Sequence, residues 1–277
     1  MPPKKPFEPF QFVGEGNNTG VSKFKIQPKQ KPAEKKLDDN DSLDIIVYKI
    51  DKNQQVLPPS MTQNQIPAHP FRILNSGASG SGKTMLMVNL LKRKNFMAGF
   101  FDQIFLFSPT AKGDSMQSFL EIHNDHLESD LDTHGVEHLN YIFDRQTELV
   151  EQKGYLKSPK VLILFDDIIS SPKFMNSSVF KKCFIQSRHI NMSVCVCTQK
   201  YHSVPRICRL SATDIFFFPS AQSEIKRISE EYTPANKTTT QFTRLIEFAT
   251  DEPHSFLYIC NKSDRKYRKN LSQYISI

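Results

Sequence analysis

The sequence has no apolar run long enough to cross a lipid bilayer. Its longest uninterrupted runs, such as residues 161–165, are far shorter than the roughly 20 residues of a membrane-spanning helix. Mean hydropathy is −0.45. The N-terminal residues MPPKKPFEPF are charged and have no apolar stretch behind them. We therefore expect neither membrane insertion nor a secretory signal.

Cysteine is also scarce. The five cysteines are odd in number and lie mostly in apolar, strand-like runs. This pattern favours reduced thiols in a cytosol-like compartment over a disulfide framework. Cys195 and Cys197 fall on one face of a predicted strand, but no second Cys/His pair with zinc-site spacing follows. We therefore expect both thiols to pack in the core rather than to bind a metal.

Tryptophan is absent, whereas phenylalanine occurs 22 times. Phe216, Phe217 and Phe218 continue a strand pattern, and we expect them in the core rather than on a surface that stacks against bases.

Positive charge is concentrated at the two ends. The formal net charge is +7, and residues 1–36 carry eight lysines and three glutamates. Residues 261–277 carry five basic residues and Asp264, so the stretch between the two ends sums to −2. Such ends could follow a polyanion, because each neutralised phosphate releases counterions. The alternative is that they are solvated, disordered tails that aid solubility.

Composition divides the chain into three regions. Residues 1–40 carry six prolines and no helical or alternating period, which predicts a disordered basic arm. Residues 41–260 begin with a strand-like run at 44–50 and a proline-rich linker or extended wrap at 57–70, and then alternate strands with helical segments. This alternation predicts an α/β fold with a mainly parallel central sheet flanked by helices. Residues 261–277 are predicted to be a basic C-terminal tail. The strands predicted after the linker are residues 71–75, 104–107, 161–165, 192–198, 214–218 and 256–260.

The strongest chemical signal is the octapeptide GASGSGKT. It fits the pattern G-x-x-x-x-G-K-[ST], and it lies between a predicted strand and an apolar-periodic helix. Its glycines allow consecutive N–H groups to wrap a phosphate chain. Lys83 then reaches the β- and γ-phosphates of ATP, and Thr84 offers a hydroxyl to Mg²⁺. The predicted nucleotide-binding residues are Gly77, Ala78, Ser79, Gly80, Ser81, Gly82, Lys83 and Thr84.

Two carboxylates, Asp166 and Asp167, follow the apolar run at 161–165. A buried central strand ends in this way where it opens at a ligand crevice. Asp166 is predicted to hold Mg²⁺, directly or through water, and Asp167 to polarise the attacking water. The alternative is an Asp-Asp helix cap after a strand. Many hydrolytic P-loop enzymes have the longer Glu at the position of Asp167.

The strand at 192–198 ends on a polar pair, Thr198 and Gln199. A polar side chain at the tip of a strand beside the phosphate site can hydrogen-bond the γ-phosphate or the attacking water. We predict that Gln199 is this sensor.

Together, GASGSGKT, VLILFDD and QSRHINMSVCVCTQ resemble the successive motifs of the viral genome-packaging ATPases of the FtsK–HerA superfamily, in the branch of large DNA viruses and virophages. The resemblance covers roughly residues 70–260. It implies a RecA-like P-loop core that forms a homo-oligomeric ring and uses ATP hydrolysis to drive double-stranded DNA into a preformed capsid. It further implies contacts with viral capsid proteins, and a location in the host cytoplasm at a viral factory or in the virion.

The same resemblance implies an arginine that acts across a subunit interface. Arg188, in the run Arg-His-Ile-Asn-Met-Ser, matches the family pattern before the sensor strand. Arg206 and Arg209 are the alternatives, and an ordinary surface ion pair is the competing interpretation of each arginine.

The segment 121–138 combines four histidines with several acidic residues. The spacings 123/126 and 134/138 would place each pair of histidines on one helical face, as in a metal site. Few apolar residues are present to fix such ligands, so we expect a solvated helix and loop. The acid-rich insertion at 112–153 is long enough to carry a partner contact.

Three hypotheses for the function remain. The first is a DNA-translocating packaging ATPase. The second is another nucleic-acid P-loop ATPase, such as a replicative helicase. The third is a nucleotide-gated scaffold that binds DNA or a capsid without turnover.

Overall fold

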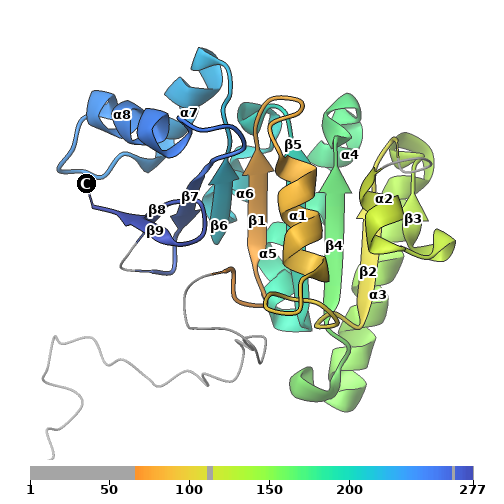
Figure 1. The fold of residues 1–277 in the computed structure, drawn as a ribbon. Helices are drawn as coiled ribbons and strands as arrows, with labels where there is room; N and C mark the ends of the chain where they lie inside the picture. Colours follow the sequence, from red (N-terminus) through yellow and green to blue (C-terminus); the bar gives the residue numbers. More distant parts are fainter. Residues whose placement is uncertain (1–65, 111–114, 264–265, 277) are drawn as a thin grey trace, which may run out of the picture. The chain divides into compact units, whose positions relative to one another are not determined.

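The computed structural model describes residues 66–110, 115–263 and 266–276. The predictions for residues 1–40, for the run at 44–50 and for the first part of the linker lie outside these residues and stay predictions. Within the described residues, nine strands form one sheet in the order β3-β2-β4-β5-β1-β6-β7-β8-β9 (Figure 1). The strands are β1 Arg72–Ser76, β2 Gln103–Phe107, β3 Leu127–Glu128, β4 Val161–Asp166, β5 Met192–Thr198, β6 Asp214–Phe217, β7 Leu257–Cys260, β8 Tyr267–Lys269 and β9 Gln273–Ile275.

The sheet is parallel from β3 to β6, and β7, β8 and β9 continue it in antiparallel register. The expected α/β fold with a mainly parallel sheet is confirmed. The bounds of the six predicted strands agree with the structure to within one residue. They were predictable because buried parallel strands consist of unbroken runs of Val, Ile, Leu and Phe.

Helices cover both faces of the sheet. In Figure 1, α1 lies over one face, and α5 and α6 lie over the other. The helices are α1 Lys83–Lys92, α2 Ser115–Leu120, α3 Val136–Lys153, α4 Pro172–Asn176, α5 Ser178–Gln186, α6 Arg206–Ser211, α7 Gln222–Tyr232 and α8 Thr239–Ala249. A capping box begins α8, where Thr238 Oγ1 accepts a hydrogen bond from the backbone N of Gln241 at 3.2 Å.

A hydrophobic core lies on each face of the sheet, and the side chains of β5 alternate between these two cores. Val194 and Val196 pack in the core that contains α3 and α5, whereas Cys195 and Cys197 pack in the core beneath α1. All five cysteines are free thiols. The expected core position of Cys195 and Cys197 is confirmed.

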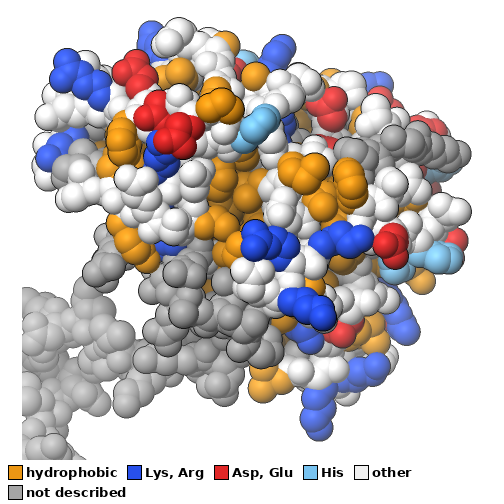
Figure 2. Space-filling model, in the orientation of Figure 1, with side chains coloured by type: hydrophobic (Ala, Val, Ile, Leu, Met, Phe, Trp, Pro, Cys, Tyr) orange, Lys and Arg blue, Asp and Glu red, His pale blue; other side chains and the backbone are white. Residues whose placement is uncertain are grey.

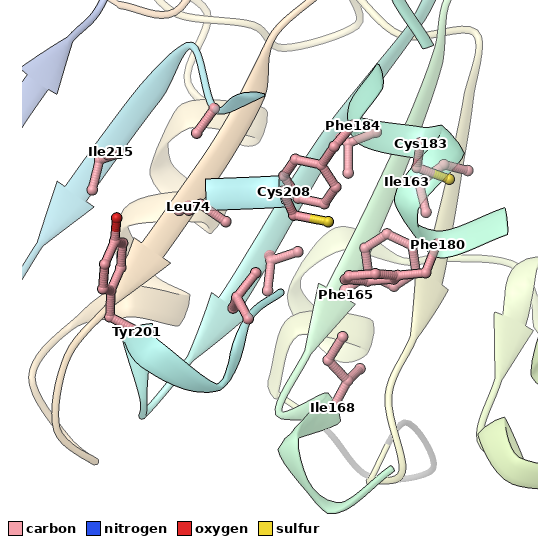
Figure 3. Close-up of a cluster of buried hydrophobic side chains, with 14 of the residues drawn as sticks. Leu74, Ile163, Phe165, Ile168, Phe180, Cys183, Phe184, Tyr201, Cys208 and Ile215 are labelled. Carbon is pink, nitrogen blue, oxygen red and sulfur yellow. The ribbon is translucent and has the colours of Figure 1, made fainter. Parts of the chain in front are cut away.

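Phenylalanine fills much of the core on the α5 side. Figure 3 shows Phe180 of α5 lying against Phe165 of β4, and their ring centroids are 5.0 Å apart. Phe216, Phe217 and Phe218 are each at most 1% exposed. They belong to the core, as the sequence predicted.

A fully buried histidine connects the segment before β1 to β5. His69 Nε2 lies 2.8 Å from Asn191 Oδ1, and His69 Nδ1 lies 2.6 Å from Ser193 Oγ. The Asn191 amide nitrogen donates to the carbonyl of Ser158 at 2.9 Å, so its oxygen accepts from His69. Burial lowers the pKa of His69 to about 4, against the opposing hydrogen bond to Asn191. The imidazole is therefore neutral at pH 7.

The C-terminal region differs from its expected role as a basic tail. Residues 267–269 and 273–275 form β8 and β9, which pair with β7 and with each other. Two of the five basic residues, Arg268 and Lys269, are buried. The guanidinium of Arg268 packs between the rings of Tyr258 and Tyr274, with its carbon 5.0 and 4.7 Å from the two ring centroids. The sheet therefore extends past residue 260.

Candidate active site

The phosphate-binding loop, residues 77–84, connects the end of β1 to the start of α1. Gly77 is required by close packing, because a Cβ atom there would lie 2.4 Å from Cβ of Phe218. Gly82 has φ 110°, a conformation that side chains rarely adopt, and it immediately precedes α1. The backbone N of Ala78 donates to the carbonyl of Pro219 at 3.0 Å, which attaches the loop to the end of β6.

Lys83 turns back over this loop. Its side chain is buried, and Nζ donates to the carbonyls of Gly77 at 2.8 Å and Ala78 at 2.7 Å. Burial lowers the pKa of Lys83, while the carboxylates of Asp166 and Asp167 act in the opposite direction. The ammonium is therefore held against the backbone of the loop by two carbonyl groups.

The start of α1 suits a bound phosphate. No side chain accepts a hydrogen bond from the backbone N–H groups in the first turn of α1. Uncapped N–H groups and the helix dipole favour an anion. Ala78, Ser79 and Gly80 are exposed, and Ser81 and Thr84 are partly buried, so the loop is open to solvent. The residues present therefore fit the phosphates of ATP.

Asp166 and Asp167 lie beside this loop at the end of β4. Asp166 is paired with Cys197 in the register between β4 and β5. Asp167 has φ 50°, in the left-handed region that Asp tolerates better than most residues, and its backbone N donates to the carbonyl of Cys197 at 3.2 Å. The interpretation of the pair as a simple helix cap finds no support, because Asp167 makes no side-chain cap on the short helical turn that follows.

Gln199 and Asp167 are in direct contact. Gln199 Nε2 donates to Asp167 Oδ1 at 3.2 Å. β5 lies between β4 and β1, so the polar residue after β5 necessarily lies between the acid pair and the phosphate loop. The structure thus brings the predicted loop, acid pair and sensor to the carboxyl ends of three adjacent strands.

The chemistry of the donors also fits Mg²⁺. Thr84 supplies a hydroxyl at the first turn of α1, and Asp166 supplies a carboxylate at the end of β4. Both are oxygen ligands, and proteins commonly hold Mg²⁺ through one or two such groups together with phosphate oxygens and water.

Arg188 does not lie at this edge of the sheet. It is exposed on the short helical turn Ser187–Ile190, directly before β5, whereas the loop and acids follow the other ends of β1 and β4. The seven residues of β5 separate the two edges by roughly 20 Å. Arg188 therefore cannot reach the phosphate loop of its own chain.

The two alternative arginines differ from each other. Arg209 is buried, and its Nη2 donates to Glu231 Oε1 at 2.6 Å while its Nη1 donates to the carbonyl of Val204 at 2.6 Å. Burial alone would raise the pKa of Glu231, but the hydrogen bonds from Arg209 lower it overall. Arg209 thus serves the internal packing of its own chain. Arg206 is exposed at the start of α6.

Two contacts at the loop were not predicted from the sequence. His254 Nδ1 lies 3.2 Å from the carbonyl of Ser81, and Asn75 Nδ2 donates to the carbonyl of Lys83 at 2.9 Å. Asn75 had a detectable signal, because it is a polar amide that directly follows the apolar Ile73 and Leu74 of β1. His254 had none, since it comes from a loop far away in the sequence.

The histidines of segment 121–138 lie in ordinary side-chain contacts. His138 Nδ1 is 3.2 Å from Glu128 Oε2, and the ring of His126 packs on Phe105 with a centroid distance of 4.2 Å. No group of three or more His, Cys, Asp or Glu side chains suited to a metal occurs among the described residues. The described helices also include none that combines the length and the apolar character of a membrane span.

The sheet, the loop and the acid pair define a P-loop ATPase fold. B204, the DNA-packaging ATPase of Sulfolobus turreted icosahedral virus, aligns with a TM-score of 0.50 at 16% identity, over 75% of this chain and 98% of that one. EssC (ATPases 2 and 3) of Geobacillus thermodenitrificans aligns with a TM-score of 0.51 at 11% identity, over 73% of this chain and 39% of that one. At such identities the likeness shows the fold alone.

Sequence comparison gives the family. The family described as Poxvirus A32 protein matches residues 60–264, and the chain belongs to it. The DNA packaging protein OPG160 of variola virus and that of vaccinia virus (strain Copenhagen) are each 26% identical to this chain over 164 residues. These matches cover 57% of this chain, and the chain spans 57% of the length of those relatives.

Proposed function

We propose that this protein is an ATP-hydrolysing motor that translocates double-stranded DNA into a viral capsid. The family membership and the relatives named DNA packaging protein support the biological role. The observation that carries the proposal is the hydrogen bond between Gln199 and Asp167 beside the phosphate loop, at 3.2 Å. It joins a carboxylate that can polarise water to an amide that orients this carboxylate. A site that only binds a nucleotide does not need such a pair.

The chain's own residues divide the chemistry among them. Lys83 and the first N–H groups of α1 hold the phosphates of ATP, and Thr84 and Asp166 hold Mg²⁺. Bound Mg²⁺ supplies positive charge to the phosphate oxygens. Asp167 accepts a hydrogen bond from the attacking water and polarises it, while Gln199 fixes the direction of the Asp167 carboxylate.

Arg188 completes the site of a neighbouring copy. It is exposed at the edge of the sheet opposite to its own loop, so that it can contribute only to another subunit. An arginine supplied in this way can accelerate phosphoryl transfer by ~10³–10⁵. The active form is therefore a homo-oligomer, which we propose to be a ring. Its further partners are duplex DNA and viral capsid proteins, and it works at the cytoplasmic viral factory or in the virion.

Mixing two inactive variants tests this arrangement. Arg188→Ala protein should bind ATP nearly normally and hydrolyse it poorly, and Lys83→Ala protein should not bind ATP tightly. Mixed oligomers contain interfaces that join an intact loop to an intact arginine, so mixing should restore hydrolysis. Mixed oligomers with no more activity than the two variants alone would show that Arg188 does not act across the subunit interface. The exposed Arg206 would then be the residue to test.

Translocation separates the proposal from the helicase alternative. A motor that moves along intact duplex should displace a third strand bound in the major groove, in a reaction that requires ATP. A helicase should instead separate a forked duplex. ATP-dependent strand separation without displacement of the third strand would contradict a packaging motor.

A further inference from the structure

A cavity of about 780 Å³ opens beside the phosphate loop. One wall consists of the loop and α1, together with Arg93 and Phe96 after α1 and Phe119 of α2. The other wall is formed by residues after β6, before β7 and in the turn between β8 and β9. Figure 2 shows hydrophobic side chains gathered in a hollow beside α1. Its volume is within the range of small-ligand pockets. The residues that matter below are Phe218, His254, Phe256, Asn270, Leu271 and Ser272.

The strand order fixes the direction in which a nucleotide would extend. The γ-phosphate must face Asp167 and Gln199, which follow β4 and β5. These strands lie on one side of β1, and β6 and β7 lie on its other side. The end of the molecule that carries the sugar and base must therefore point away from β4 and β5. The wall of the cavity formed by the segments after β6, before β7 and after β8 lies in that direction, and the cavity shares Lys83 and Thr84 with the phosphate site.

The lining of the cavity suits a flat, aromatic ligand with a few polar atoms. The rings of Phe218 and Phe256 are 4.9 Å apart at 41°, and both contribute to the apolar wall. Asn270 Oδ1 accepts from the backbone N of Phe256 at 3.2 Å, which leaves the amide N–H groups as donors at the cavity. His254 contacts the carbonyl of Ser81 and so joins this wall to the phosphate loop. Aromatic and apolar walls with a few placed polar groups are typical of sites for small organic ligands.

The turn between β8 and β9 is held firmly in place. Arg268, which is stacked between two tyrosines, donates from Nη1 to the carbonyl of Leu271 at 3.4 Å. Lys269 Nζ donates to Asp251 Oδ1 at 2.5 Å and to Glu252 Oε1 at 3.0 Å, in the loop that also carries His254. Two of the basic C-terminal residues therefore position the outer wall of the cavity.

We propose that this cavity binds the nucleoside of ATP and that the β8–β9 hairpin is the part of the fold that closes it. The proposal rests on the proposed ATPase function, because it requires phosphates at the loop. It gives the basic C-terminal segment a role in nucleotide recognition.

A fluorescence experiment tests the placement of the base. The natural chain has no tryptophan, so a single introduced indole can be observed alone. Ser272 lines the cavity, whereas its exposed neighbour Gln273 does not. Emission from Ser272→Trp should change when ADP is added and stay unchanged with inorganic tripolyphosphate, which lacks sugar and base. Gln273→Trp should respond to neither compound. Equal responses of Ser272→Trp to ADP and tripolyphosphate would overturn the proposal.

Calorimetric titration provides the second test. Leu271→Ser removes apolar surface from the cavity and should weaken ADP binding by about tenfold. Its affinity for tripolyphosphate should equal that of the parent protein, whereas Lys83→Ala should lose both ligands. Parent-like ADP affinity in Leu271→Ser would refute the nucleoside pocket and leave the ATPase proposal standing. A parent protein that binds neither ligand would contradict the ATPase function and the pocket together.

Discussion

The amide of Gln199 donates a hydrogen bond to the carboxylate of Asp167, and 3.2 Å separates Nε2 from Oδ1. The two residues are distant in sequence but follow neighbouring strands, β5 and β4. Parallel pairing ends both strands at one edge of the sheet, so backbone hydrogen bonds set the relative position of the two side chains. This contact makes Gln199 a positioning residue for the predicted water-polarising group.

Asp167→Asn should keep ATP binding and lose hydrolysis. The amide preserves size and can still hydrogen-bond Gln199, but it is too weak a base to polarise water, so kcat should fall by about 10²–10⁴. Steady-state hydrolysis and equilibrium ATP binding measure the two effects separately. Hydrolysis at the parent rate would show that another group acts on the water.

Gln199→Ala should lower kcat while leaving KM nearly unchanged, because the side chain contacts Asp167 rather than the phosphate loop. In an Asp167→Asn background the same change should cost little more, since the two residues act as one unit. Effects that multiply in the double variant would contradict this coupling.

Asp166→Asn should make turnover strongly dependent on the Mg²⁺ concentration or abolish it. A neutral amide is a poorer ligand for Mg²⁺ than a carboxylate. Titration of Mg²⁺ against the hydrolysis rate, compared with the parent protein, measures the effect. An unchanged Mg²⁺ dependence would exclude Asp166 from the metal site.

We expect the buried His69 to make the folded protein less stable in mild acid. Its pKa is about 4 in the folded protein and 6.5 ordinarily, so only the unfolded chain binds the proton between these values. Stability is therefore complete above pH 6.5, and about 3 kcal/mol is lost as the pH falls to 4. Urea unfolding of the parent and His69→Gln proteins across this range measures the effect. If the unfolding free energies of the two proteins depended equally on pH, His69 would not be the source of the loss.

The two basic ends should behave differently toward DNA. If the predicted arm contacts phosphates, deletion of residues 1–36 should flatten the slope of log affinity against log salt for duplex DNA. Lys269 pairs with Asp251 and Glu252, so Lys269→Ala should lower the thermal midpoint and leave that slope unchanged. An unchanged slope after the deletion would leave the arm as a solubility tail or a tether.

The sequence predicts best those parts of the fold and site whose identifying residues lie together in one strand or one loop. The phosphate loop and the acid pair are contiguous, and apolar strands such as 192–198 have clear bounds. The hairpin of β8 and β9 was missed because its short strands contain Arg268 and Lys269, which usually indicate exposure. Only the tyrosine rings and two distant acids make their burial possible, and such partners depend on tertiary structure. His254 at the phosphate loop was missed for the same reason.

ATP hydrolysis measured with and without duplex DNA distinguishes a DNA-translocating motor from a protein that only binds nucleotide. We expect the parent protein to hydrolyse ATP and intact duplex to accelerate the reaction. Lys83→Ala protein, which carries the same basic ends, should show neither activity. Tight binding of ATP and duplex DNA without any hydrolysis would contradict the motor and favour a nucleotide-gated scaffold.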